Sequence, residues 1–172
     1  MAVVAHNFPN ANQLLMTKTW NWNNSDTHVV GLIATGTFNW VAGTYGYTTV
    51  AQFLANAGTG GGGSLVESTG TGYARQALTS VSVSTSTLYT TLVVGTNPSW
   101  AASTISAKYA FFYDAAPATG STAIATTNDA TTNQLIAYWD FQGTNTDSNG
   151  VYTLLMPTAN AVAGALVQIT AA

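Results

Sequence analysis

The sequence predicts a mainly β protein: a single β-sandwich or jelly-roll-like domain with one short helix and an extended N-terminal arm. From about residue 73 onward, short alternating segments are separated by Ser, Thr and Gly turns, the spacing expected of a sandwich or barrel. Charged residues make up only 5% of the 172 residues, against roughly 25% in an ordinary soluble domain. We expect the arm at residues 1–24 and the β domain at residues 25–172.

Two segments, residues 107–114 and 134–141, are the strongest strand candidates. Both carry bulky side chains on both faces, which is typical of central strands buried on two sides. The expected faces are Tyr109, Phe111 and Tyr113 against Phe112 in the first segment, and Leu135, Trp139 and Phe141 against Ile136 and Tyr138 in the second. The apolar run at residues 29–34 predicts a further buried strand.

The best helix candidate is residues 48–57, because Val50, Phe53 and Leu54 recur at helical spacing and Thr48 or Thr49 can cap the start. The glycine run that follows predicts a flexible loop. Residues 115–133 are longer than a hairpin needs and predict a surface or contact loop. Asn149 and Gly150 predict a turn, and residues 165–170 predict a last strand.

The charge balance argues against several kinds of partner. The chain has three basic and six acidic residues and a net charge of -3. Lys18, Arg75 and Lys108 form no basic stripe that would neutralise phosphates, so we expect binding neither to nucleic acid nor to an anionic membrane. The chain has no cysteine, no run long enough for a membrane span and no signal-peptide pattern at its start, so we expect synthesis in a cytoplasm.

No catalytic, cofactor or metal site is expected. Gly58, Gly60 and Gly63 spell G-x-G-x-x-G, but a helix precedes them and strands follow, the reverse of a dinucleotide site. His6 and His28 are too few ligands for zinc, and we expect them at the surface or in turns. The chain also lacks the G-x-S-x-G elbow of a serine hydrolase.

Asp114 and Asp140 end or interrupt the two aromatic segments. Paired carboxylates are the basis of glycoside hydrolysis, but an Asp at a strand end more often accepts a hydrogen bond from the following turn. If Asp140 faces inward, it needs a partner such as Arg75 or Lys108, because a buried charge must be compensated.

Four aromatic residues are candidates for a contact surface: Trp20, Trp22, Tyr45 and Tyr47. They have the chemistry of a stacking platform for sugars. Packing in the core or anchoring of a neighbouring subunit is favoured, because aromatic side chains dominate both cores and interfaces.

Four phrases in the sequence together resemble a known family. They are SDTHVVGLI (25–33), STGTGYARQALT (68–79), WAASTISAKYAFFYD (100–114) and LIAYWDF (135–141), with SNGVYT (148–153) downstream. In this order and spacing they resemble small, β-rich virion structural proteins of tailed bacteriophages. The resemblance covers roughly residues 20–170.

The resemblance implies a virion component without catalytic residues: a capsid decoration or cement protein that stabilises the head shell. The partners it implies are the major capsid protein and further copies of the chain in a homo-oligomer. The alternative is a tail or fibre-associated subunit that recognises host glycans. The neutral-polar composition also favours a subunit that is packed against neighbours, since charge keeps free-standing surfaces soluble.

Overall fold

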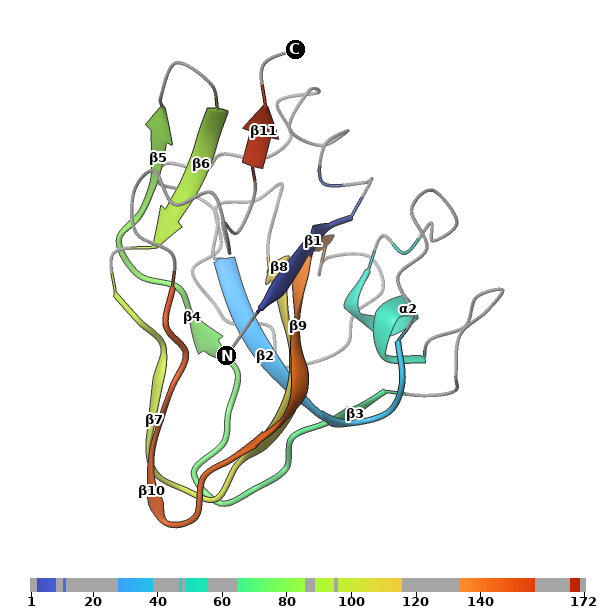
Figure 1. Ribbon diagram of the computed structural model, residues 1–172, viewed down its shortest axis with the longest axis vertical. Helices are drawn as coiled ribbons and strands as arrows, with labels where there is room; N and C mark the ends of the chain where they lie inside the picture. Colours follow the sequence, from blue (N-terminus) through green and yellow to red (C-terminus); the bar gives the residue numbers. More distant parts are fainter. Residues whose placement is uncertain are drawn as a thin grey trace.

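A computed structural model describes residues 3–8, 11, 28–38, 47, 49–55, 65–85, 89–94, 96–115, 134–156 and 168–170. The fold is mainly β with a short helix, α2 (Val50–Ala55), and all strand pairs are antiparallel (Figure 1). The predicted fold class is therefore confirmed.

A central sheet organises the molecule. Its strand order is β1-β9-β8-β2-β3, and β4 also pairs with β2. The strands are β1 (Val4–Asn7), β2 (His28–Thr35), β3 (Val66–Glu67), β4 (Gln76–Ala77), β8 (Ser106–Asp114) and β9 (Gln134–Thr146). The three segments predicted as buried strands thus lie side by side as β2, β8 and β9.

The other strands form two smaller sheets. One is the ribbon of β7 (Ser99–Ser103) and β10 (Gly150–Thr153), and the other contains β5 (Val81–Thr85), β6 (Tyr89–Val94) and β11 (Gln168–Thr170). The β7–β10 ribbon continues β8 and β9, because Ile105 and Asp147 exchange backbone hydrogen bonds between the two pairs. Near this junction Ala102, Gln142 and Asn149 have positive φ angles of 48°, 57° and 57°. β7 and β8 form one arm of a long hairpin, and β9 and β10 form the other. The positive φ angles help both arms to bend, as strands do when they pass from one sheet to another.

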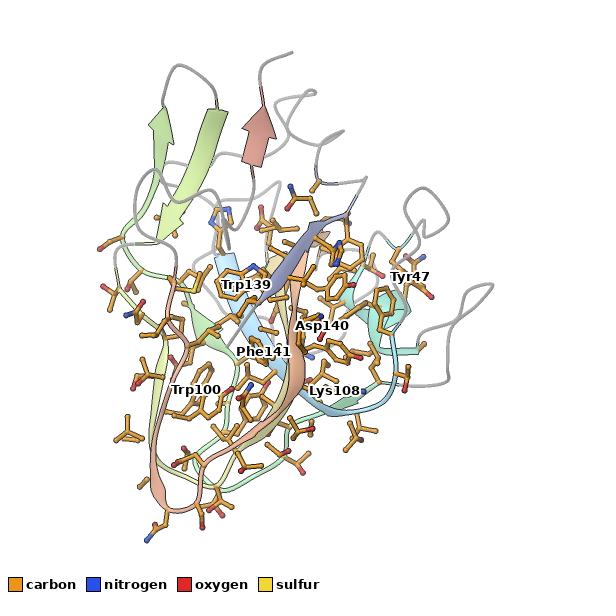
Figure 2. The ribbon with its side chains drawn as sticks, in the orientation of Figure 1. Tyr47, Trp100, Lys108, Trp139, Asp140 and Phe141 are labelled. Atoms are coloured by element: carbon orange, nitrogen blue, oxygen red, sulfur yellow. The ribbon has the colours of Figure 1, made fainter. Side chains whose placement is uncertain are left out.

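The bend places the β7–β10 ribbon on one side of the central sheet and α2 on the other (Figure 1). Two apolar cores result. The ribbon-side core includes Trp100, Trp139 and Phe141, and the helix-side core includes Phe53 and Tyr47 (Figure 2). Strands β2, β8 and β9 contribute to both cores, which explains why their sequences carry bulky residues on both faces.

One detail of the predicted strand faces is wrong. Leu135 lies in the helix-side core with Tyr138, whereas Ile136 joins Trp139 and Phe141 in the ribbon-side core. The register explains the change: Phe112 pairs with Ala137 and Tyr113 pairs with Leu135, which leaves Ile136 as an extra residue. This β-bulge breaks the two-residue alternation on which the prediction rested. The predicted faces of β8 are confirmed.

Gly31 allows an aromatic ring to lie against the centre of the sheet. It pairs with Phe111 across β2 and β8, and a Cβ atom at Gly31 would stand 2.3 Å from Cζ of that ring. Any larger residue would displace Phe111 from the helix-side core, where it contacts the Phe53 ring.

The helix begins with a reciprocal cap. The Thr49 hydroxyl accepts a hydrogen bond from the Gln52 amide at 3.4 Å, and the Gln52 side chain accepts one from the Thr49 amide at 3.3 Å. This is the capping-box arrangement, which satisfies two otherwise free amides. Of the two predicted caps, Thr49 is the residue used.

We predict that Thr49→Ala lowers the free energy of unfolding by about 1 kcal/mol, the usual effect of losing a cap. Chemical denaturation monitored by tryptophan fluorescence measures it. Because Ala55 is exposed at the other end of α2, Ala55→Ser is a suitable control and should change stability by less than about 0.5 kcal/mol. Equal losses in the two variants would contradict a capping role.

Part of the predicted N-terminal arm belongs to the central sheet. Residues Val4–Asn7 form β1, which pairs with β9, and most of the remaining arm lies outside the described residues. The predicted contact loop at 115–133 also lies outside them except for buried Ala115. At the predicted turn of Asn149 and Gly150 the structure has a bend instead of a hairpin: Asn149 has a φ of 57° and Gly150 begins β10, which pairs with β7. Within the last predicted strand, Gln168–Thr170 form β11.

Candidate functional site

The charged residues in the described part of the chain are all at least half-buried. They are Glu67, Arg75, Lys108, Asp114, Asp140 and Asp147. The exposed described residues are instead Thr, Ser, Ala, Gly, Asn, Gln, Val and Leu. The described surface is therefore free of fully exposed charge.

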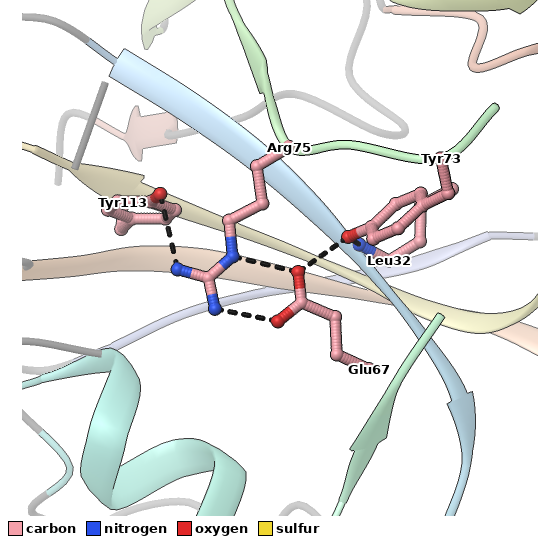
Figure 3. A network of polar contacts seen from close by, with 5 residues as sticks. All are labelled: Leu32, Glu67, Tyr73, Arg75 and Tyr113. Atoms are coloured by element: carbon pink, nitrogen blue, oxygen red, sulfur yellow. Dashed lines mark hydrogen bonds and ion pairs between the residues drawn. The ribbon is translucent and has the colours of Figure 1, made fainter. Parts of the chain in front are cut away.

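The ion pair of Arg75 with Glu67 is the centre of a network of polar contacts that also includes Leu32, Tyr73 and Tyr113 (Figure 3). Arg75 donates two hydrogen bonds to the Glu67 carboxylate, at 2.8 and 2.6 Å. The Tyr73 hydroxyl donates to the same carboxylate at 2.7 Å and accepts from the Leu32 amide at 2.8 Å. The side chains of Arg75 and Glu67 are only 5% and 22% exposed. We call this group the Arg75–Glu67 network.

The guanidinium of Arg75 also contacts strand β8. Its Cζ atom lies 5.3 Å from the centre of the Phe111 ring and 5.4 Å from that of Tyr113, within cation–π range. An Arg75 NH group donates to the Tyr113 hydroxyl at 3.4 Å. One side chain thus connects Glu67 of β3 with β8, two strands away in the sheet order.

The segment that carries Tyr73 and Arg75 also binds the ribbon. The Gln76 side chain donates to the Ser99 carbonyl at 2.6 Å and accepts from the Ser99 amide at 3.1 Å, as a neighbouring strand would. The Trp100 indole donates to the Ala74 carbonyl at 2.7 Å, and the Thr104 amide donates to Thr71 at 2.9 Å. Residues 68–79, one of the phrases of the family resemblance, therefore connect the central sheet to the ribbon.

Ionisation in this region favours stable pairing. Burial alone would lower the pKa of Arg75, but its hydrogen bonds to Glu67 and Tyr113 outweigh burial and raise the pKa. Burial raises the pKa values of Tyr73 and Tyr113, the latter against the opposing effect of Arg75. A cation and two neutral phenols therefore persist at neutral pH, as a stabilising ion pair requires.

The carboxylates of Asp140 and Asp147 accept hydrogen bonds from nearby polar groups. Asp140 lies within β9 and not at a strand end as expected, and it accepts a hydrogen bond at 2.8 Å from the amide of Gln142, a residue of the same strand with a positive φ. Arg75 pairs with Glu67 instead. Asp147 accepts from Ser103 at 2.9 Å and from the Gly150 amide at 3.2 Å.

Lys108 bonds to the main chain. Its Nζ donates to the Gly36 carbonyl at 3.0 Å and lies 5.3 Å from the centre of the Tyr109 ring. The ammonium group is therefore held against the protein, and its charge is partly covered by a carbonyl dipole and an aromatic face.

His28 is buried and not at the surface or in a turn as expected, whereas His6 is partly exposed at the edge of the central sheet. His28 begins β2 and is 3% exposed, directly opposite Asp114 of β8, because β2 is a central strand. His6 lies in β1 and stacks on Tyr138, with ring centres 5.0 Å apart. Burial lowers the pKa of His6, and Asp140 partly opposes the shift. Among the described residues, no group of three or more His, Asp or Glu side chains has the geometry to hold a metal ion.

Of the four predicted contact aromatics, Tyr47 is the one within the described residues. It is 5% exposed and packs against the rings of Phe38 and Phe53 (Figure 2). Tyr47 is therefore a core residue in this structure. Trp20, Trp22 and Tyr45 lie outside the described residues.

Comparisons with models of known protein families, with curated proteins and with solved structures give no match. Within the described part of the chain, no helix has the length and apolar character needed to span a membrane.

The ribbon side contains a tyrosine whose ionisation reports on packing. Burial raises the pKa of Tyr152 from 10.0 to about 12, and its ring packs against Trp100 at 5.9 Å. Because the folded state holds this proton more tightly than the unfolded state, the stabilisation is complete below pH 10 and is lost as the pH rises toward 12.

We therefore predict that stability falls at alkaline pH and that Tyr152→Phe makes this fall shallower. Denaturation at pH values from neutral to strongly alkaline, with tyrosinate absorbance followed in parallel, measures both effects. The variant should match the parent chain at neutral pH. An unchanged alkaline slope in the variant would show that Tyr152 does not contribute.

Proposed function

We propose that the chain is a structural subunit of a bacteriophage virion, a decoration or cement protein that binds the head shell and stabilises it. One observation carries the proposal: the six charged residues in the described part of the chain are all at least half-buried. A free-standing soluble domain relies on exposed charge against association. A subunit covered by neighbours has no such need.

The outer face of the β7–β10 ribbon supports contact with neighbours. Val151 and Leu155 are 64% and 74% exposed, and Val151 lies opposite Ala101 in the ribbon. Among the described residues that pair across β7 and β10 on this face, the polar pair is Ser99 with Thr153, whose hydroxyls are 3.2 Å apart. Such a face packs against another uncharged surface without burying an unpaired charge.

The interior supports a mechanical role. Two apolar cores flank one sheet; the Arg75–Glu67 network holds residues 68–79 on that sheet, and hydrogen bonds from Gln76 join the same segment to the ribbon. A subunit of this kind transmits force between neighbours through packed strands. Many copies, each with a modest interface, then add up to substantial stabilisation of a shell.

Particles assembled without this chain test the proposal. We expect them to release DNA at a lower temperature than complete particles, and purified protein to restore the release temperature when it is added back. A dye that reports released DNA during heating gives the measurement. Identical release temperatures with and without the chain would contradict a stabilising role on the head.

A further inference from the structure

Strand β1 is an N-terminal strand at the outer edge of the central sheet (Figure 1). It pairs with β9 in a defined register, from Val4 opposite Asp140 to Asn7 opposite Ala137. The ladder continues to Phe8, whose amide donates to the Ile136 carbonyl at 3.0 Å.

The contacts that seat this strand come from distant parts of the chain. Phe8 is fully buried, and its ring lies 5.5 Å from that of Phe53 in α2 and 5.9 Å from that of Tyr138 in β9. His6 stacks on the same Tyr138 ring. We call the site on α2 and β9 that holds these side chains the β1 seat. Ala11 extends the attachment, because its amide donates to the Phe8 carbonyl at 2.9 Å and its side chain is buried in the ribbon-side core.

We propose that β1 is exchanged between copies of this chain, so that residues 4–8 of one copy, together with Ala11, occupy the β1 seat of another. The occupant is defined by the structure itself, because the segment seated in one molecule has the side chains that fit the identical seat of the next. Exchange of an identical element preserves every contact and is a low-cost route to association.

Chain length and charge both permit the exchange. Residues 12–27 join Ala11 to β2, and a segment of this length reaches up to about 50 Å when extended. The first seventeen residues contain no Asp, Glu, Lys or Arg, so the strand meets no like-charge repulsion at a neighbour. The inference rests on the proposed function in that it describes how copies interlock within the assembly.

Engineered disulfides test the exchange in a chain that has no cysteine of its own. Asn7 and Ala137 are a non-hydrogen-bonded pair, because the bond from Phe8 to Ile136 brackets them. Their Cα atoms are therefore about 4.5 Å apart, within the range for a disulfide. Asn7→Cys chains and Ala137→Cys chains are unfolded together, refolded at high concentration and oxidised.

The matched control is Ser99→Cys mixed with Thr153→Cys. These residues form the same kind of pair within the internal ribbon, bracketed by the bond from Leu154 to Pro98. We expect the Asn7→Cys and Ala137→Cys mixture to form at least about ten times more interchain disulfide than the control, since a tenfold ratio corresponds to about 1.4 kcal/mol of preference. Non-reducing gels and mass spectrometry measure the yields.

Equal yields in the two mixtures would overturn the exchange. The double variant, with both Asn7→Cys and Ala137→Cys in one chain, shows whether β1 pairs with β9 at all, because without exchange its disulfide forms within a single chain. If the double variant forms only intrachain disulfides after it is refolded at high concentration, β1 stays in its own molecule. This result would not contradict the proposed function, because that proposal is tested separately by the DNA-release temperature of particles with and without the chain.

Discussion

Replacing Gly70 with alanine is expected to destabilise the domain by about 3 kcal/mol or more, the upper range for overpacking. A Cβ atom at Gly70 would lie 1.5 Å from the carbonyl oxygen of Thr104. This neighbour is backbone, so it cannot rotate away as a side chain would. The Thr104 amide also donates a hydrogen bond to the Thr71 carbonyl. The clash would therefore break this hydrogen bond and push residues 68–79 away from the segment that joins β7 to β8.

Gly143→Ala provides the control for this prediction. A Cβ atom at Gly143 would meet nothing within 4 Å, so the change should alter stability by no more than about 0.5 kcal/mol. Urea denaturation of the parent and both variants gives the comparison. A stable Gly70→Ala variant would contradict the close approach of the two backbone segments.

The second large effect is expected at the Arg75–Glu67 network. Glu67→Gln should cost about 3 kcal/mol, because removal of one partner leaves the other charge buried without compensation. Arg75, with a side chain 5% exposed, would then be the uncompensated charge. Tyr73, whose hydroxyl donates to Glu67 at 2.7 Å, would bond to a neutral acceptor in place of a carboxylate.

A double-mutant cycle separates this coupling from general loss of packing. We expect Glu67→Gln combined with Arg75→Met to be less destabilised than the sum of the two single variants by about 1–3 kcal/mol, the range for residues in one network. Free energies of unfolding of the four proteins give the coupling. Strict additivity would show that the two side chains do not stabilise each other.

Sequence patterns are most informative where burial dictates residue type. The central position of β2, β8 and β9 follows from bulky residues on both faces, and α2 follows from the spacing of Val50 and Phe53 together with a threonine cap. The bulge at Ile136 was not predictable in this way, because an extra residue changes the register without changing composition. β1 was missed because four residues at a sheet edge leave a weak pattern.

The candidate site was only partly predictable. The pairing of Arg75 with Glu67 had a usable signal: in a chain with three cations, Glu67 is the acidic residue closest to Arg75 in the sequence. The burial of the other charges depends on long-range contacts, such as that of Lys108 with Gly36, which are 72 residues apart. The same holds for Tyr47, whose place in the core is set by Phe38 and Phe53.

The inward position of the charged side chains links the fold to the proposed role. Burial of the described charges strengthens cohesion within one subunit, and the exposed Val151 and Leu155 leave an apolar face for neighbours. A subunit that works as part of a shell gains from both properties, because its surface is covered wherever the shell is complete.

The copy number of this chain in purified particles, relative to the major capsid protein and measured by quantitative mass spectrometry, tests the proposed function most directly. We predict a number close to one copy per capsid subunit or per lattice position, as a protein that follows the symmetry of the head requires. A small fixed number of copies would move the chain to the tail and favour host recognition. Its absence from the particle would contradict a role in the virion altogether.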